Sequence, residues 1–250
     1  MHRIFVAPHN VNIVDRLVVI DDEQARHIER VLRLKSGDSL TAFDGTGAEY
    51  NLRLQGRIDG TLVGEIEDIR AANREPQLRL ALIQGIAKGD KMDTIIQKAV
   101  EIGISAIYPV VTQYSVVRLD KEKAEKKVNR WQTIAREACK QCRRNLIPEI
   151  KPVMDLQACY SHIKDAPVIM LYENETEIRL RTVLEQNADK LKNNTVFLLV
   201  GPEGGFSPEE VAEVQSRGGA TAGLGPRILR TETAGLAAAS IIMYELGDLG

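Results

Sequence analysis

The sequence lacks the features that identify the commonest nucleotide-binding and membrane proteins. Neither G-x-G-x-x-G nor G-x-x-x-x-G-K-[ST] occurs in the 250 residues, which excludes the easiest NAD and NTP interpretations. No apolar run approaches the roughly 20 residues of a membrane-spanning helix. The first residues, Met1-His-Arg-Ile-Phe-Val, do not have the layout of a signal peptide. We therefore expect a cytoplasmic protein with no membrane partner.

Cysteine and net charge are also scarce. The three cysteines, Cys139, Cys142 and Cys159, are too few and too unevenly placed for a disulfide framework. The C-x-x-C pair lies inside an expected helix, has no second ligand pair and is accompanied by only four scattered histidines, so we expect no metal and no redox role. Cys142 is expected on the buried face of that helix, with Trp131. The net charge of −2 means that any nucleic-acid contact must come from a local basic patch.

Apolar residues make up 44% of the chain, enough for real cores, and their pattern changes along it. Up to about residue 70 the sequence predicts short strands and one helix, 22–32, with Ala25, Ile28, Val31 and Leu32 on one face. A polar linker, 71–76, ends in proline, and we place the domain boundary there. The expected domains are 1–72, small and β-rich, and 73–250. The expected strands of the first are 4–6, 16–20, 39–43, 49–54 and 61–66.

The second domain alternates between strand and helix, which predicts an α/β fold. Unbroken apolar strands at 168–172 and 196–200 are typical of a parallel sheet covered on both faces. Further strands are expected at 78–83 and 104–111, and helices around 92–100, 121–144 and 233–246.

The first candidate site is the turn Gly201–Gly205 (GPEGG), which ends a buried strand. The next helix opens with Ser207-Pro-Glu-Glu210, a capping box, so the turn lies at the carboxyl end of a parallel strand, where α/β sheets bind ligands. Glycines let a flat ligand approach the backbone. The alternative is an ordinary strand-to-helix turn that binds no ligand.

The second candidate site is the segment 223–233 (GLGPRILRTET). Arg227 and Arg230 can hold a phosphate or a base carbonyl, and Glu232 lies at the start of a small-residue helix. The purely structural alternative is a helix start capped by Thr231 or Thr233, with Glu232 interacting with the helix dipole. That alternative does not explain two arginines so close to the glycines.

The roles of two further segments remain open. Between Arg118 and Arg144 there are ten basic and four acidic residues; a solvated face is the usual explanation, and phosphate binding is the alternative. The loop 88–93 (KGDKMD) is either a substrate-contacting loop or a helix cap at Asp90.

Several motifs in one order give the chain a resemblance. Besides the two glycine segments, these are 88–93, the helix with 97–103 (QKAVEIG), Arg130-Trp131 and 137–144 (EACKQCRR). Together they resemble the RsmE family, 16S ribosomal RNA (uracil-N3)-methyltransferases of the SPOUT superfamily. The resemblance covers essentially the whole chain.

The resemblance implies a fold, a cofactor and partners. It implies a SPOUT α/β domain with a C-terminal trefoil knot after a PUA-like RNA-binding β-barrel, S-adenosylmethionine as cofactor, a homodimer, and 16S rRNA in the assembled 30S subunit as substrate. Arg230, Glu232 and Arg144 are the catalytic candidates. The expected cofactor-binding residues are Leu171, Tyr172, Val200, Gly201, Glu203, Gly204, Gly205, Leu224, Gly225, Ile228, Leu229 and Ala234. The expected RNA-binding residues are Arg3, Arg26, Arg30, Arg33, Lys88, Lys91 and Arg143.

Two rival functions stay open. One is a SPOUT methyltransferase that acts on a different RNA position. The other is a non-catalytic ribosome-binding protein, which would have no need of the two glycine segments.

Overall fold

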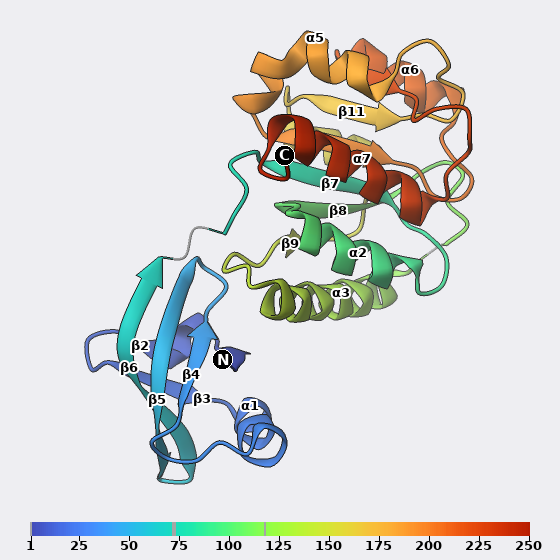
Figure 1. Cartoon of the computed structure of the whole chain (residues 1–250). Coiled ribbons are helices and arrows are strands. Elements are labelled where there is room, and N and C mark those ends of the chain that lie inside the picture. Colours follow the sequence, from blue (N-terminus) through green and yellow to red (C-terminus); the bar gives the residue numbers. More distant parts are fainter. Residues whose placement is uncertain (1, 72–73, 118) are drawn as a thin grey trace. The chain divides into compact units, whose positions relative to one another are not determined.

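The computed structural model describes residues 2–71, 74–117 and 119–250, which form two compact units (Figure 1). The first unit comprises Met1–Glu75 and Cys139–Ile147, and the second comprises Pro76–Ala138 and Pro148–Gly250. The expected boundary at 72/73 lies outside the described residues, so that division of the chain stays a prediction.

A six-stranded sheet forms the first unit, in the order β1-β4-β5-β6-β3-β2. β1 pairs with β4 in parallel, and the other pairs are antiparallel. One side of this sheet buries a core that includes Ile4, Leu40, Leu52 and Ile66. The strands are β1 (Arg3–Phe5), β2 (Val11–Asn12), β3 (Leu17–Ile20), β4 (Ser39–Phe43), β5 (Ala48–Ile58) and β6 (Thr61–Ala71); a 3₁₀ turn, η1, spans Pro8–Asn10.

The helix expected over 22–32 is present in two parts, and one residue expected on its buried face is exposed. α1 (Asp22–Arg26) passes into a π-helical segment, η2 (His27–Leu32). A π turn takes more residues than an α turn, so positions after it rotate away from the original face. Ile28 stays buried, whereas Val31 is 66% exposed.

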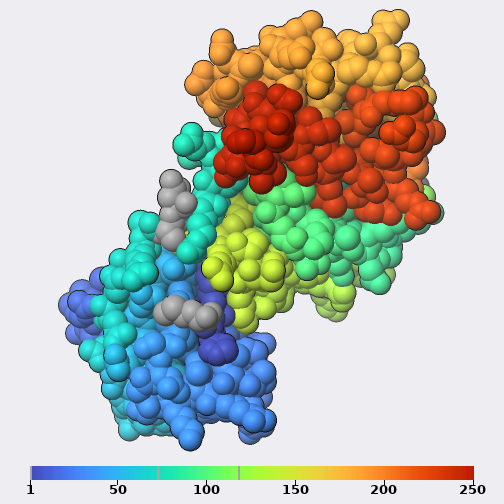
Figure 2. All heavy atoms as spheres, viewed as in Figure 1, coloured from blue at the N-terminus to red at the C-terminus, as the bar shows by residue number. Residues whose placement is uncertain are grey.

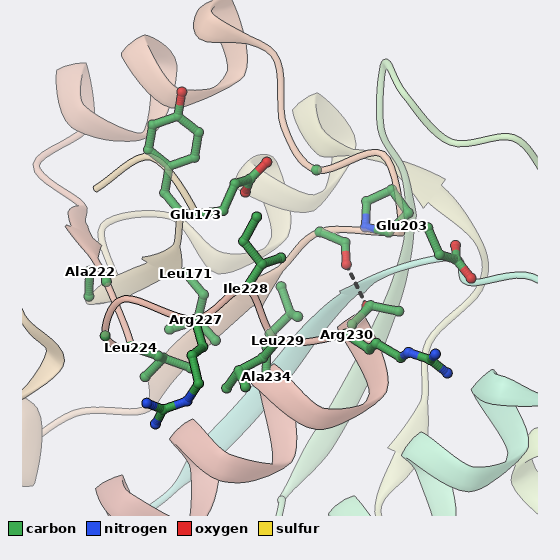
Figure 3. Close-up of a pocket in the computed structure, with 18 of the residues that line it drawn as sticks. Leu171, Glu173, Glu203, Ala222, Leu224, Arg227, Ile228, Leu229, Arg230 and Ala234 are labelled. Atoms are coloured by element: carbon green, nitrogen blue, oxygen red, sulfur yellow. Dashed lines mark hydrogen bonds between the residues drawn. The ribbon is translucent and has the colours of Figure 1, made fainter. Parts of the chain in front are cut away.

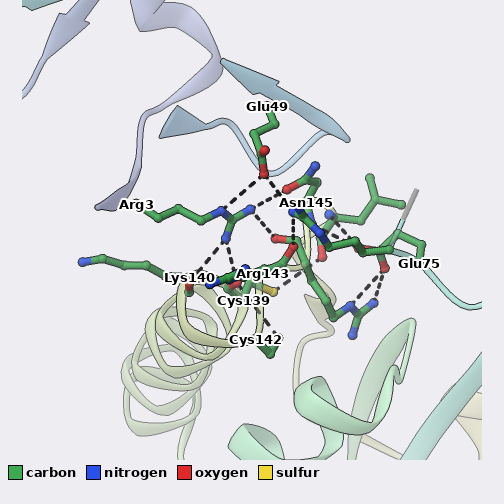
Figure 4. Close-up of polar contacts among 11 residues, drawn as sticks. Arg3, Glu49, Glu75, Cys139, Lys140, Cys142, Arg143 and Asn145 are labelled. Atoms are coloured by element: carbon green, nitrogen blue, oxygen red, sulfur yellow. Dashed lines mark hydrogen bonds and ion pairs between the residues drawn. The ribbon is translucent and has the colours of Figure 1, made fainter. Parts of the chain in front are cut away.

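The end of the long basic helix belongs to the first unit (Figure 4). This helix is α3 (Lys121–Cys142); Arg118, the first residue of the expected basic segment, lies outside the described residues. The guanidinium of Arg3 donates hydrogen bonds to the carbonyl oxygens of Cys139 (2.8 Å) and Arg144 (2.9 Å). A cation near the last carbonyls of a helix stabilises that end. The sequence pattern did not indicate that 139–147 joins this unit.

The second unit is a parallel sheet in the order β10-β8-β7-β12-β11-β13, with β9 beside β8. No helix in the described part of the chain is long and apolar enough to cross a membrane. The strands are β7 (Leu80–Gly85), β8 (Ala106–Val111), β9 (Glu149–Ile150), β10 (Met154–Asp155), β11 (Val168–Leu171), β12 (Val196–Val200) and β13 (Ala220–Ala222). The remaining helices are α2 (Lys91–Ile102), α4 (Leu156–Ile163), α5 (Leu180–Lys192), α6 (Pro208–Ser216) and α7 (Thr231–Leu246).

Helices cover both faces of this sheet (Figure 1). α4 and α6 pack on one face, over Ile83, Met170 and Leu199. α2 and α7 pack against each other, and α7 lies on β12 on the other face. All five residues of β12 are therefore buried, which confirms the expectation from its unbroken apolar run.

The capping box expected before α6 is present. The Ser207 side chain accepts the Glu210 amide, and the Glu210 side chain accepts the Ser207 amide. Ser207 is fully buried. Ser207→Ala is expected to lower the free energy of unfolding by about 1–2 kcal/mol, because the Glu210 amide loses its acceptor. Urea denaturation measures this, and Ser216→Ala, an exposed serine at the other end of α6, should change it by less than about 0.5 kcal/mol.

Candidate functional site

The carboxyl ends of β11, β12 and β13 enclose a pocket of about 550 Å³ (Figure 3). Its walls come from residues 171–173, 200–205 and 222–231, with Lys91 and Ala234. All twelve residues expected to bind a cofactor line it, so the structure brings together three segments far apart in the sequence. Their roles in binding remain predictions.

Backbone and apolar side chains make up most of the pocket wall. At Gly225, φ is +116° and an added Cβ would meet no atom within 4 Å, so the space beside its backbone is open. At Gly204, an added Cβ would lie 2.8 Å from the Tyr114 carbonyl oxygen, so this turn and Tyr114 can approach only because residue 204 is glycine. Leu171 and Val200 add buried apolar surface. A wall of this kind suits a flat ligand that is read largely by backbone groups.

A buried polar network fixes the base of the pocket. Gln84, at the end of β7, is fully buried, and its Nε2 donates to the Thr231 hydroxyl at 2.9 Å. That hydroxyl donates to the Gly201 carbonyl oxygen at 2.6 Å (Figure 3). The network ties β7, the Gly201–Gly205 turn and the start of α7 together. Sequence reasoning missed Gln84, although a lone glutamine in an apolar strand was a signal.

The expected threonine cap of α7 is wrong. Arg230 holds the N-cap position, and no side chain forms a capping hydrogen bond there. Thr231 donates its hydroxyl to Gly201 instead. At α2 the N-cap position is Asp90, as expected, but its side chain makes no capping bond either.

Lys91 lies between two carboxylates at one side of the pocket. Its Nζ is 3.1 Å from Glu203 Oε1 and 3.2 Å from Glu232 Oε2. Hydrogen bonds with these two partners raise the pKa of Lys91. For Glu203 and Glu232, partial burial raises the pKa, but each residue's own amide and the Lys91 ammonium outweigh it, so both pKa values lie below their usual range. Both carboxylates are therefore ionised at neutral pH.

The two arginines of the segment 223–233 have different surroundings. Figure 3 shows the Arg227 and Arg230 side chains on opposite sides of the pocket. Glu173, two residues after the end of β11, also lines the pocket and is exposed; the expected cofactor-binding residues ended at Tyr172, one residue before it. The pocket therefore combines an apolar wall with carboxylates and arginines at its edge.

Comparisons with known proteins agree with this geometry. A family model described as an RNA methyltransferase domain matches residues 73–243, and one described as an RNA methyltransferase PUA domain matches residues 20–67. The ribosomal RNA small subunit methyltransferase E of Bacillus subtilis is 35% identical over 228 residues, which cover 90% of this chain and 89% of that protein. The chain belongs to the RsmE family. The expected combination of an α/β methyltransferase domain with a PUA-like domain is thereby confirmed.

Solved structures of RsmE relatives extend the likeness to three dimensions. The ribosomal RNA small subunit methyltransferase E of Neisseria gonorrhoeae, bound to S-adenosyl methionine, is 33% identical with a TM-score of 0.87, and the match covers 100% of both chains. A Legionella pneumophila protein, solved with bound SAM, is 32% identical with a TM-score of 0.83 and covers 99% of this chain and 98% of that one.

The third RsmE catalytic candidate, Arg144, lies in the first unit. Its guanidinium donates to Glu75 Oε2 at 2.7 and 3.0 Å, and Arg144 is only 5% exposed. Glu75 Oε1 also accepts the amides of Asn145 and Leu146, at 3.1 Å each (Figure 4). These contacts give Arg144 a role in holding the segment 139–147. A catalytic role for it stays a prediction.

The expected RNA-binding residues differ in how accessible they are. Only 9% of the Arg3 side chain is exposed, and its guanidinium lies 3.8 Å from the centre of the Phe43 ring. Such burial gives a phosphate little room to reach Arg3. The other six are exposed except Lys91, which is half-buried. They are Arg26 on α1, Arg30 on η2 and Arg33 directly after η2, Lys88 and Lys91 at the start of α2, and Arg143 directly after α3.

The cysteines have ordinary structural surroundings. Cys139 is fully buried, and burial raises the pKa of its thiol to about 12. Cys142 is half-buried, so the expectation that it lies in the core is wrong; Cys139 takes that place. Within the described ranges, no three His, Cys, Asp or Glu side chains are grouped to hold a metal ion.

Proposed function

We propose that this chain methylates N3 of one uridine in 16S ribosomal RNA of the assembled small subunit, in the cytoplasm, with S-adenosylmethionine as the methyl donor. The observation that carries the proposal is the pocket: in a chain of the RsmE family, three strand-end loops enclose about 550 Å³ beside Arg230 and Glu232. Relatives with the same fold bind this cofactor.

The residues of the pocket fit an adenosyl cofactor. The apolar wall, with Leu171, Leu224 and Leu229, suits an adenine ring, and the open backbone at Gly225 allows close approach. The volume falls in the range of small-molecule sites. When bound, the cofactor supplies an electrophilic methyl group on a sulfonium centre.

The chain's own residues then have two tasks. Uracil N3 carries a proton and is a poor nucleophile at neutral pH, so the proton must leave and the charge that develops on O2 and O4 must be stabilised. Arg230 lines the pocket and provides a guanidinium for that charge. Glu232 is the candidate base: its carboxylate is ionised at neutral pH and lies 3.2 Å from Lys91, which lines the pocket, so it has the form that can accept a proton.

Glu232→Gln is expected to lower the methyl-transfer rate constant roughly 100-fold, because the amide has no basic oxygen. The pKa of Glu232 lies below its usual range, so the wild-type carboxylate is in its basic form at every pH above that range. The ratio of wild-type to variant rates should therefore be constant between about pH 6 and pH 9. Single-turnover kinetics measure this. Glu101→Gln, on α2, is the matched control, and a wild-type rate in Glu232→Gln would remove the base assignment.

Binding of RNA and dimerisation complete the proposal. The exposed arginines of α1 and η2, with Lys88 and Arg143, supply cations for phosphates.

α7 leaves Ile241 and Tyr244 exposed, by 41% and 62%, and the last residues lie at the surface in Figure 2, which supports a homodimer. The proposal includes a trefoil knot, with which the close approach of two loops is compatible: Gly223 exchanges backbone hydrogen bonds with Ile178 and Leu180 in a parallel bridge.

Calorimetry and methyl transfer test the proposed function together. The protein is expected to bind S-adenosylmethionine and to transfer labelled methyl to small subunits from a strain that lacks its gene. Absence of cofactor binding would favour a non-catalytic ribosome-binding protein. Methyl on another position would favour a different RNA methyltransferase.

A further inference from the structure

Lys91 is a lysine that lines the pocket. Its ammonium is within 3.2 Å of carboxylates from two other segments: Glu203 in the Gly201–Gly205 turn and Glu232 in the first turn of α7. Lys91 itself is the first residue of α2. One side chain therefore joins three elements that meet at the pocket.

A second contact makes this junction tighter. Glu203 Oε1, the oxygen that faces Lys91, also accepts the backbone amide of Lys88 at 3.1 Å. The carboxylate of Glu203 thus contacts both the first and the last residue of the 88–91 loop. Lys88 differs from Lys91 in its side chain, which is exposed and forms no ion pair with any residue that the structure describes.

The charges indicate what the junction does. Glu203 and Glu232 are both ionised and lie close enough to share one ammonium, so they would repel each other without it. The charged partner of Glu232 Oε2 is the Lys91 ammonium, 3.2 Å away. The position of this oxygen therefore depends on the charge of Lys91.

We propose that Lys91 is a positioning residue, which holds Glu203 of the cofactor turn and Glu232 of α7 at fixed places beside the pocket, and that it does not bind RNA phosphate. This rests on the proposed function, since Glu232 is its candidate base. Lys88, three residues earlier, is then the RNA-contacting lysine of the loop.

A comparison of Lys91→Met, Lys91→Arg and Lys88→Met tests the proposal. Lys91→Met is expected to lower kcat roughly 10-fold to 100-fold, because a misplaced catalytic group costs about that much, with the Kd for small subunits unchanged within about twofold. Lys91→Arg keeps a cation that reaches both carboxylates and should recover most of kcat. Lys88→Met should weaken subunit binding and reduce the salt slope of log K by about 1, with kcat at saturation retained.

The proposal is wrong if Lys91→Met behaves like Lys88→Met, or like the wild type. The ion pairs of Lys91 remain in contact with solvent, and such pairs contribute little to stability, so all three variants should fold. A readout without RNA is the ¹³C titration of glutamate carboxyls in the free protein, in which Lys91→Met should raise the pKa values of Glu203 and Glu232. Unchanged titrations would overturn the proposal even if no transfer is detected. An inactive wild type with shifted titrations would instead overturn the proposed function alone.

Discussion

Arg230→Ala is expected to lower the methyl-transfer rate constant roughly 100-fold to 1000-fold, with the affinity for S-adenosylmethionine within about threefold of wild type. Removing one preorganised donor from a developing negative charge costs about this much in other enzymes. Arg230 is exposed at the N-cap of α7 and lines the pocket. Its guanidinium makes no hydrogen bond or ion pair with any described residue, so it is available to a substrate.

Single-turnover transfer to small subunits and calorimetry with the cofactor measure the two quantities separately. Arg217→Ala is the matched control: Arg217 is at the end of α6, where it pairs with Glu213 at 2.9 Å, and its loss should leave transfer unchanged. If Arg230→Ala transferred methyl at the wild-type rate, the charge stabilisation assigned to Arg230 would be wrong. A loss of cofactor affinity equal to the loss of rate would move Arg230 to cofactor binding.

Gly204→Ala is expected to weaken S-adenosylmethionine binding roughly 10-fold to 100-fold. An added Cβ would lie 2.8 Å from both Cβ and the carbonyl oxygen of Tyr114. Backbone atoms cannot rotate away as the tip of a side chain can, so the Gly201–Gly205 turn must shift by several tenths of an ångström. Overpacking of this kind costs about 1–3 kcal/mol, and the shift moves the turn that forms one wall of the pocket.

Gly218→Ala is the control for this glycine. Gly218 has φ of +76° and no atom within 4 Å of an added Cβ, so alanine there adds backbone strain without contact. It should lower stability by about 1 kcal/mol or more and leave the cofactor affinity unchanged. Calorimetry on both variants decides the matter: if Gly204→Ala binds the cofactor like the wild type, the turn is not part of the binding wall.

Local patterns predicted the site better than the fold. The glycine turns and the strands before them were recognisable because glycine, proline and a capping box act on neighbouring residues. The strand order could not be recognised in this way. β12 pairs with β7, which precedes it by more than a hundred residues, and nothing in either apolar run specifies that partner.

The residues that sequence reasoning missed act through tertiary contacts. Gln84 reaches the pocket from β7 through Thr231, and Glu75 holds the segment 139–147 through Arg144. Lys91 was among the residues expected to bind RNA, and that role stays untested, but the local sequence gave no indication of its carboxylate partners. Its two carboxylates come from positions more than a hundred residues away.

The central claim is that this protein places a methyl group on N3 of one uridine in the small-subunit RNA. Mass-spectrometric mapping of 16S rRNA from a strain that lacks its gene tests that claim most directly. We predict the loss of a single 3-methyluridine, restored by the wild-type gene and not by the gene with Arg230→Ala. An unchanged methylation map in the deletion strain would contradict the account.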